Sequence, residues 1–176
     1  MSNGGIKVEV NGVEFDARPG EMLIAVTDRA GIYVPRFCYH EKLSVAANCR
    51  MCLVDVANVP KPLPACATPV TNGMKVATRS QKAIGAQKAT MEFLLINHPL
   101  DCPICDQAGE CKLQDNAVAG GLPVSRTSEP RRQFPGYDRT EIGPHVIADM
   151  TRCIQCTRCI RFCEEITETG ELTFIE

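Results

Sequence analysis

The stretch Ile6-Lys7-Val8-Glu9-Val10-Asn11-Gly12-Val13-Glu14-Phe15-Asp16-Ala17 alternates apolar and other residues on both sides of an Asn-Gly pair. Alternation at a period of two is typical of half-buried strands, and Asn-Gly favours the two-residue turn of a β-hairpin. The sequence therefore predicts a hairpin of residues 6–10 and 13–17.

Further elements complete a small domain after this hairpin. Pro19-Gly20 breaks the chain, and residues 21–30 read as a helix that ends at Gly31. Short strands are predicted at 53–56 and 74–78. The fold class is therefore α+β, with a first domain of residues 1–78.

The rest of the chain is less regular. Ser80 is the predicted N-cap of a helix that reaches to about Asn97, with His98 on its apolar face. Residues 99–119 form a compact loop with a short helical turn, and a connector rich in Gly and Pro follows at 120–145. The chain is predicted to turn helical again after Cys159.

Cysteine is the unusual component, with 11 among 176 residues. The N-terminus has the features of neither a secretory signal nor a transit peptide, and no apolar run approaches the roughly 20 residues that span a bilayer. We therefore expect a cytosolic protein whose clustered thiols bind metal instead of forming disulfides. A net charge of −2 gives no electrostatic case for nucleic acid.

The first set of cysteines lies within the first domain, and its members are Cys38, Cys49, Cys52 and Cys66. The pair at 49 and 52 places two thiols on one tight loop. Prolines 60, 62 and 64 keep the chain before Cys66 extended. Four thiolates suit a [2Fe–2S] cluster, and a structural four-cysteine zinc site is the alternative.

The second set consists of three cysteines and one histidine: His98, Cys102, Cys105 and Cys111. A lone histidine at a helix end usually caps or packs. Here three cysteines leave one ligand missing, which favours His98 as the fourth. Imidazole ligation is known for other cluster types.

The third set is Cys153, Cys156, Cys159 and Cys163, in the C-x2-C-x2-C-x3-C arrangement of bacterial ferredoxins. This run indicates a [4Fe–4S] cluster, although Glu164 stands where proline is usual. The fourth cysteine of such runs ligates another cluster, so the role of Cys163 is open; our interpretation is a small buried residue. Three arginines (Arg152, Arg158 and Arg161) are expected around this set, where they favour reduction.

The order of these motifs resembles a known family. The stretches His98-Pro-Leu-Asp-Cys-Pro-Ile-Cys-Asp-Gln-Ala-Gly-Glu-Cys-Lys-Leu-Gln-Asp115 and Met150-Thr-Arg-Cys-Ile-Gln-Cys-Thr-Arg-Cys-Ile-Arg-Phe162 follow a four-cysteine domain. The chain thereby closely resembles the N-terminal iron–sulfur region of the large (G-type) subunit of NADH:quinone oxidoreductase, respiratory complex I. The resemblance is weakest across the connector.

The resemblance implies a plant-ferredoxin-like β-grasp domain with one [2Fe–2S] cluster on the first set. It implies a [4Fe–4S] cluster on the second set, His98 included. It also implies a further [4Fe–4S] cluster on Cys153, Cys156 and Cys159 plus a cysteine well downstream, so the chain holds one or two [4Fe–4S] clusters. We expect domains at 1–78 and 79–119, a connector at 120–148, and the start of a third cluster domain at 149–176.

In function, the resemblance implies an electron-relay subunit of an oxidoreductase. Electrons arrive from NADH through a flavin on a partner subunit, and other iron–sulfur subunits complete the path towards quinone. No Gly-rich dinucleotide fingerprint occurs, so the chain itself is expected to have no substrate site. Its implied location is the cytoplasmic face of the cell's inner membrane, reached only through partner subunits.

Three expectations qualify this assignment. The chain ends at Glu176, before the fourth ligand of the third cluster and before the large domain of the family, and we interpret it as a fragment. An electron-input module of an NAD-reducing hydrogenase or an NAD-dependent formate dehydrogenase shares the architecture. A zinc-stabilised interaction module is the alternative from another functional class.

Overall fold

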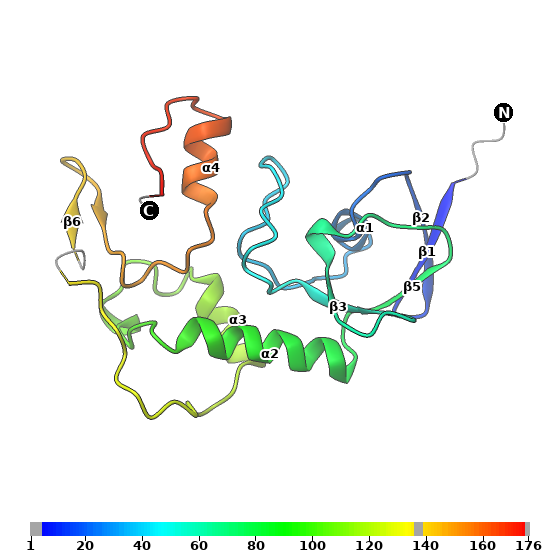
Figure 1. Cartoon of the computed structure of the whole chain (residues 1–176), viewed down its shortest axis with the longest axis horizontal. Coiled ribbons are helices and arrows are strands. Elements are labelled where there is room, and N and C mark those ends of the chain that lie inside the picture. The colour runs from blue at the N-terminus through cyan, green and yellow to red at the C-terminus, as the bar shows by residue number, and fades with distance from the viewer. Residues whose placement is uncertain (1–4, 136–138, 175–176) are drawn as a thin grey trace. The chain divides into compact units, whose positions relative to one another are not determined.

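The computed structural model describes residues 5–135 and 139–174, which form two compact units (Figure 1). The first unit comprises Met1–Gln87 and Thr157–Glu176, and the second comprises Lys88–Cys156. The C-terminal cysteine segment is therefore divided, and its last part folds with the N-terminal residues.

A five-stranded sheet in the order β2-β1-β5-β3-β4 organises the first unit. The strands are β1 (Ile6–Val10), β2 (Val13–Ala17), β3 (Leu53–Val56), β4 (Leu63–Pro64) and β5 (Met74–Ala77). β1 and β2 pair antiparallel, which confirms the predicted hairpin, and β1 pairs parallel with β5. The mixed sheet and its helices confirm the predicted α+β class.

The hairpin turn is stabilised by hydrogen bonds to a distant residue as well as by its own backbone conformation. Asn11 and Gly12 have φ of 52° and 85°, the left-handed values that this tight turn requires. The Asn11 side chain accepts a hydrogen bond from the Thr78 backbone N–H at 2.8 Å and donates to Thr78 Oγ1 at 2.9 Å. The turn is therefore fastened to the residue that follows β5.

The core of the first unit lies between the sheet and helix α1 (Leu23–Arg29), which starts two residues later than predicted. Leu23 and Ile24 are fully buried against Val8 and Val54. Cys52 and Cys66 belong to the same apolar cluster. The core thus positions part of the first cysteine set directly.

The chain just before Cys66 is extended, as predicted. Cys66 itself lies after β4 in a 3-10 turn, η1 (Ala65–Ala67). The prolines stop at residue 64, so nothing after them prevents the turn.

Helix α2 (Gln81–Leu95) begins as predicted, because Ser80 Oγ accepts a hydrogen bond from the Ala83 N–H at 3.1 Å. It ends two residues before Asn97. His98 therefore lies beyond the helix, and its predicted place on the apolar helix face is wrong.

The second unit contains more regular structure than predicted. A 3-10 turn, η2 (Cys102–Ile104), is followed by α3 (Lys112–Gly120), a full helix of nine residues. The connector includes a small ribbon of β6 (Thr140–Glu141) and β7 (Ile147–Ala148). Strands of two residues carry no periodic signal, so the sequence could not indicate them.

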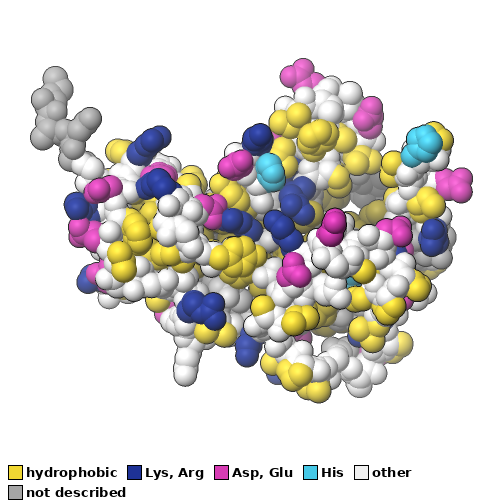
Figure 2. All heavy atoms as spheres, turned by 180° about the vertical axis from the view of Figure 1, so that it is seen from behind, with side chains coloured by type: hydrophobic (Ala, Val, Ile, Leu, Met, Phe, Trp, Pro, Cys, Tyr) yellow, Lys and Arg dark blue, Asp and Glu magenta, His cyan; other side chains and the backbone are white. Residues whose placement is uncertain are grey.

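Helix α4 (Arg158–Glu165) belongs to the first unit and starts one residue before Cys159. Lys, Arg, Asp and Glu side chains intermingle around the N-terminal strands (Figure 2), where Lys7 pairs with Glu14 and Lys75 with Glu9. In the parts of the chain that the structure describes, no helix has the length and apolar character needed to cross a bilayer.

The hairpin turn yields a stability prediction. Replacing Asn11→Ala removes a residue suited to positive φ and both hydrogen bonds to Thr78, so the free energy of unfolding should fall by about 1–3 kcal/mol. Urea denaturation followed by circular dichroism measures the change. Val13→Ala, at a side chain 56% exposed in the adjacent strand, is the control and should change stability by less than about 0.5 kcal/mol. Equal losses in both variants would contradict this account.

Candidate metal centres

All 11 cysteines are free thiols, and the first set forms one buried group. Cys38, Cys52 and Cys66 are at most 1% exposed, and Cys49 is half-buried. Hydrogen bonds between side chains join Cys38 to Cys49 and to Cys66, and join Cys66 to Cys52. Residues from three separate segments of the chain are thereby brought into contact.

These contacts lower the pKa values of two of the four thiols and raise those of the other two. The Cys49 thiol lowers the pKa of Cys38 to about 2, and the Cys66 thiol lowers the pKa of Cys52 to about 7. The same contacts, helped by burial, raise the pKa values of Cys49 and Cys66. Two thiols of the group thus have a strengthened tendency to ionise, and thiolate is the form that binds metal.

The loop before Cys52 supplies backbone donors to the sulfurs. The N–H groups of Asn48 and Cys49 donate towards the Cys38 sulfur and lower its pKa, and the Cys38 N–H donates to Cys49 Sγ at 3.4 Å. The loop turns through Ala47 and Arg50, whose φ values of 51° and 55° cost about 1–2 kcal/mol per residue. Such strain is typical of functional loops, and amides directed at sulfur stabilise negative charge.

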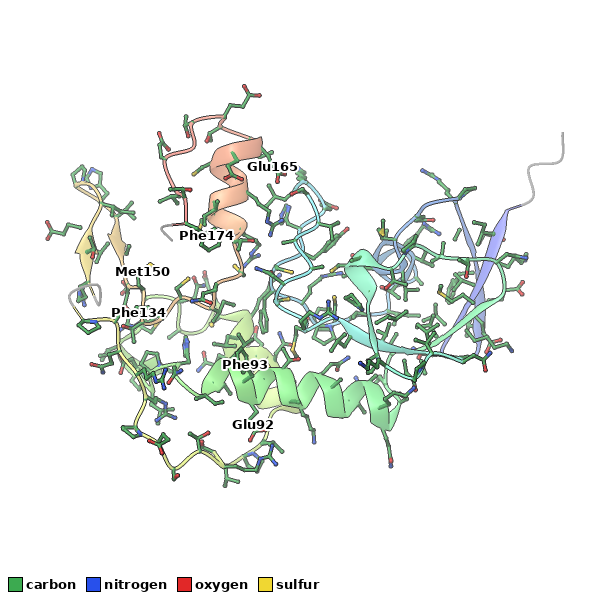
Figure 3. All side chains as sticks on the ribbon, in the orientation of Figure 1. Glu92, Phe93, Phe134, Met150, Glu165 and Phe174 are labelled. Carbon is green, nitrogen blue, oxygen red and sulfur yellow. The ribbon has the colours of Figure 1, made fainter. Side chains whose placement is uncertain are left out.

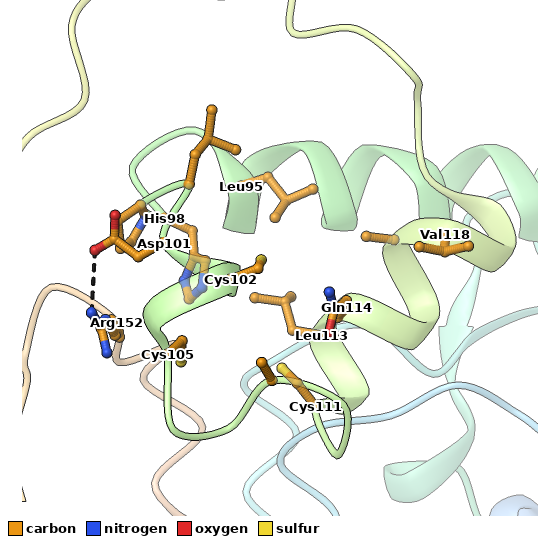
Figure 4. A pocket seen from close by; sticks show the side chains of 14 residues that line it. Leu95, His98, Asp101, Cys102, Cys105, Cys111, Leu113, Gln114, Val118 and Arg152 are labelled. Carbon is orange, nitrogen blue, oxygen red and sulfur yellow. Dashed lines mark hydrogen bonds and ion pairs between the residues drawn. The ribbon is translucent and has the colours of Figure 1, made fainter.

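The second set lines a cavity of about 300 Å³ in the second unit (Figure 4). Its donors are His98, Cys102, Cys105 and Cys111, and apolar walls come from Leu95 and Leu113. The turn η2 brings Cys102 and Cys105 close, since the Cys105 N–H donates to the Cys102 carbonyl at 3.4 Å. Gly109, with φ of 84°, then turns the chain back towards Cys111 at the start of α3.

His98 is suited to bind metal. Burial lowers its pKa, and the nearby charge of Arg152 lowers it further, so the imidazole is neutral at neutral pH. Arg152 is held by Asp101, with Nη2 at 3.3 Å from Oδ2. Its Nε lies 3.1 Å from Asp149 Oδ2 without the alignment of a hydrogen bond. Sequence reasoning placed Arg152 at the third set and did not anticipate its place at this cavity.

The third set is divided between the units. Cys153 and Cys156 lie in the second unit, while Cys159 and Cys163 lie in the first. Cys159 is exposed, whereas Cys163 is 9% exposed within α4. The Cys163 carbonyl accepts a hydrogen bond from the Thr169 N–H at 2.9 Å, which attaches the chain after α4 to the last turn of the helix.

The donor chemistry of these groups fits iron–sulfur clusters. Among residues 5–135 and 139–174, no three His, Cys, Asp or Glu side chains are arranged to hold a single metal ion. Ligands of a cluster are distributed over several irons, so grouped soft donors are the relevant feature. Thiols with one imidazole match the ligands that such clusters take.

Three family models match successive parts of the chain. Residues 4–81 match the 2Fe-2S iron-sulfur cluster binding domain, and residues 87–126 match the NADH-ubiquinone oxidoreductase-G iron-sulfur binding region. Residues 143–176 match the ferredoxin-like domain of NADH-quinone oxidoreductase subunit 3. The chain therefore carries domains for 2Fe-2S and 4Fe-4S clusters, as predicted.

Curated relatives align with nearly the whole chain. They include the NADH-ubiquinone oxidoreductase 75 kDa subunit of Reclinomonas americana, the G-type subunit of the NADH-quinone oxidoreductase of Rickettsia felis and the mitochondrial NADH-ubiquinone oxidoreductase 78 kDa subunit of Neurospora crassa. Each is 47% identical over 167 residues, or 95% of this chain. The chain spans about a quarter of their length, at 24%, 24% and 22%.

A solved structure shares the fold. A crystal structure of an NAD+-reducing [NiFe]-hydrogenase in the H2-reduced state superimposes with a TM-score of 0.82 at 24% identity, covering 97% of this chain and 71% of that chain. This likeness supports the architecture, while the sequence relatives and the ordered family models define the kinship. Over 95% of its length the chain is therefore similar to the N-terminal iron–sulfur region of the G-type subunit of NADH-quinone oxidoreductase.

Proposed function

We propose that the chain is an electron relay of an NADH:quinone oxidoreductase. In this role it accepts electrons from NADH through a flavin on a partner subunit and passes them towards quinone. The observation that carries the proposal is the buried, hydrogen-bonded group of four thiols in the first unit. Kinship with the G-type subunit provides the biological direction.

For the first set, we propose that Cys38, Cys49, Cys52 and Cys66 hold the [2Fe–2S] cluster, which supplies one-electron transfer when bound. The chain's part is to keep the sulfurs out of water and to direct backbone N–H groups at them. Burial and such hydrogen bonds are the means by which a protein sets a cluster's potential.

For the second set, the proposed ligands of a [4Fe–4S] cluster are His98, Cys102, Cys105 and Cys111. The cavity that all four line supports the assignment, as does the neutral state of His98. For the third set, we propose Cys153, Cys156 and Cys159 as ligands. The burial of Cys163 in the first unit supports a packing role for that residue.

We propose a 2Fe-2S domain at 1–78, a His/Cys-ligated 4Fe-4S domain at 79–119, a connector at 120–148 and the start of a further 4Fe-4S domain at 149–176. The proposed partners are a subunit that binds flavin and NADH and further iron–sulfur subunits, and the complex places the chain on the cytoplasmic face of the membrane. A second candidate function, an electron-input module of an NAD-reducing hydrogenase, is favoured by the structural likeness to that enzyme. The two differ in their electron acceptor.

Anaerobic purification with iron and sulfide analysis tests the relay. We expect a brown protein with similar amounts of iron and sulfide and with EPR signals of both cluster types after reduction. Electron transfer from NADH to a quinone analogue, measured in the complex with its flavin-binding partner, tests the direction. Colourless protein with stoichiometric zinc would contradict the proposal in favour of an interaction module.

Substitution of His98 tests the second set. His98→Cys should retain the [4Fe–4S] EPR signal at a lower potential, because thiolate replaces imidazole. His98→Ala should lose or weaken that signal while the [2Fe–2S] signal stays, which serves as the internal control. An unchanged [4Fe–4S] signal in His98→Ala would show that another group is the ligand.

Substitution of Cys163 tests the third set in the complex. Cys163→Ser should keep every cluster signal, since the side chain packs inside the first unit. The matched variant Cys159→Ser lies four residues earlier, at an exposed thiol, and should lose one [4Fe–4S] signal. Loss of that signal in Cys163→Ser as well would overturn the packing role.

A further inference from the structure

Helix α4 contributes a buried guanidinium to the loop that begins at Cys38. Arg161 is 7% exposed, and its Nη2 donates a hydrogen bond to the Cys38 carbonyl. Its Nη1 donates to the Ser44 carbonyl, and its Nε donates to Thr157 Oγ1 at 3.1 Å. One side chain therefore holds both ends of the segment 38–44.

A second residue of α4 strengthens this attachment. Glu165, one turn after Arg161, accepts hydrogen bonds from the Ser44 N–H at 2.7 Å and from the Ser44 hydroxyl (Figure 3). These bonds, with the charge of Arg161, lower the pKa of Glu165, so the carboxylate is ionised at neutral pH. Arg161 therefore binds the carbonyl of Ser44, and Glu165 binds its amide.

Burying a guanidinium is costly unless its donors form hydrogen bonds. The carbonyls of Cys38 and Ser44 and the Thr157 hydroxyl, all neutral groups, accept hydrogen bonds from this guanidinium. Glu165 is exposed, so water screens it more than it screens Arg161. A positive charge therefore acts through a poorly solvated region beside the first cysteine set.

We propose that Arg161 is a positioning residue for the [2Fe–2S] cluster on the first set and raises its reduction potential. The inference rests on the proposed function of that set. Reduction adds one electron to the site and makes or breaks no covalent bond. A fixed cation beside Cys38 stabilises the added negative charge, and the hydrogen bond to the Cys38 backbone fixes the position of that ligand.

The test is an EPR-monitored redox titration of the anaerobic protein with dithionite. Arg161→Gln keeps a hydrogen-bond donor and removes the charge, and Arg161→Met removes both. The equilibrium constant for reduction should fall on the order of tenfold in either variant, which is about 59 mV for one electron. Arg161→Lys should remain close to the native potential, because it restores the charge.

Lys42→Met is the matched control, since it removes an exposed positive charge from the same loop and should leave the potential unchanged. A native potential in Arg161→Gln would overturn the proposal. If Arg161→Met and Arg161→Gln fail to load the cluster, native loading and potential in Arg161→Lys support it, and failure of Arg161→Lys as well overturns it. Absence of a [2Fe–2S] signal in the unsubstituted protein would instead reject the proposed function.

Discussion

The packing of four thiols beside and within an apolar core is the constraint on which the first unit depends. Cys52 and Cys66 are part of the cluster that also contains Leu23 and Val54, so the packing of α1 against the sheet also positions these residues. A protonated thiol is a small apolar group, but a thiolate in the same place needs donors. The backbone N–H groups of Asn48 and Cys49 supply such donors, and the left-handed turns at Ala47 and Arg50 accompany that arrangement.

The geometry of the second set is determined by one short segment of the chain. Its donors come from one short segment, His98 to Cys111, and its shape follows from the turn η2 and the positive φ of Gly109. These donors line a cavity whose apolar walls include Leu95 and Leu113. Arg152, oriented by Asp101, adds a positive charge at its rim. The site therefore depends on local chain geometry more than on distant strands.

The third cysteine segment contributes an arginine to each of the other two sets, within the respective unit. Arg152, just before Cys153, lines the second cavity, and Arg161, two residues after Cys159, contacts the loop of the first set. A segment that appears in sequence as an independent binding motif thus also supplies the electrostatic surroundings of its neighbours. This suits a relay, in which centres must be tuned relative to one another. The fold alone does not decide the electron acceptor, since an NAD+-reducing hydrogenase shares it.

Local chemistry determined much of this protein in advance. Asn11-Gly12 predicted the hairpin and Ser80 predicted the start of α2, because each signal acts within a few residues. The cysteine motifs likewise indicated domains for 2Fe-2S and 4Fe-4S clusters. One prediction failed, because His98 lies past the end of the helix, and the contact of Arg161 with the Cys38 carbonyl was not anticipated. The bond from Arg161 to Cys38 joins residues 123 positions apart. Only tertiary packing decides such a contact, because a buried guanidinium is stabilised by whichever carbonyls the completed fold brings within reach, and no local window of sequence contains them.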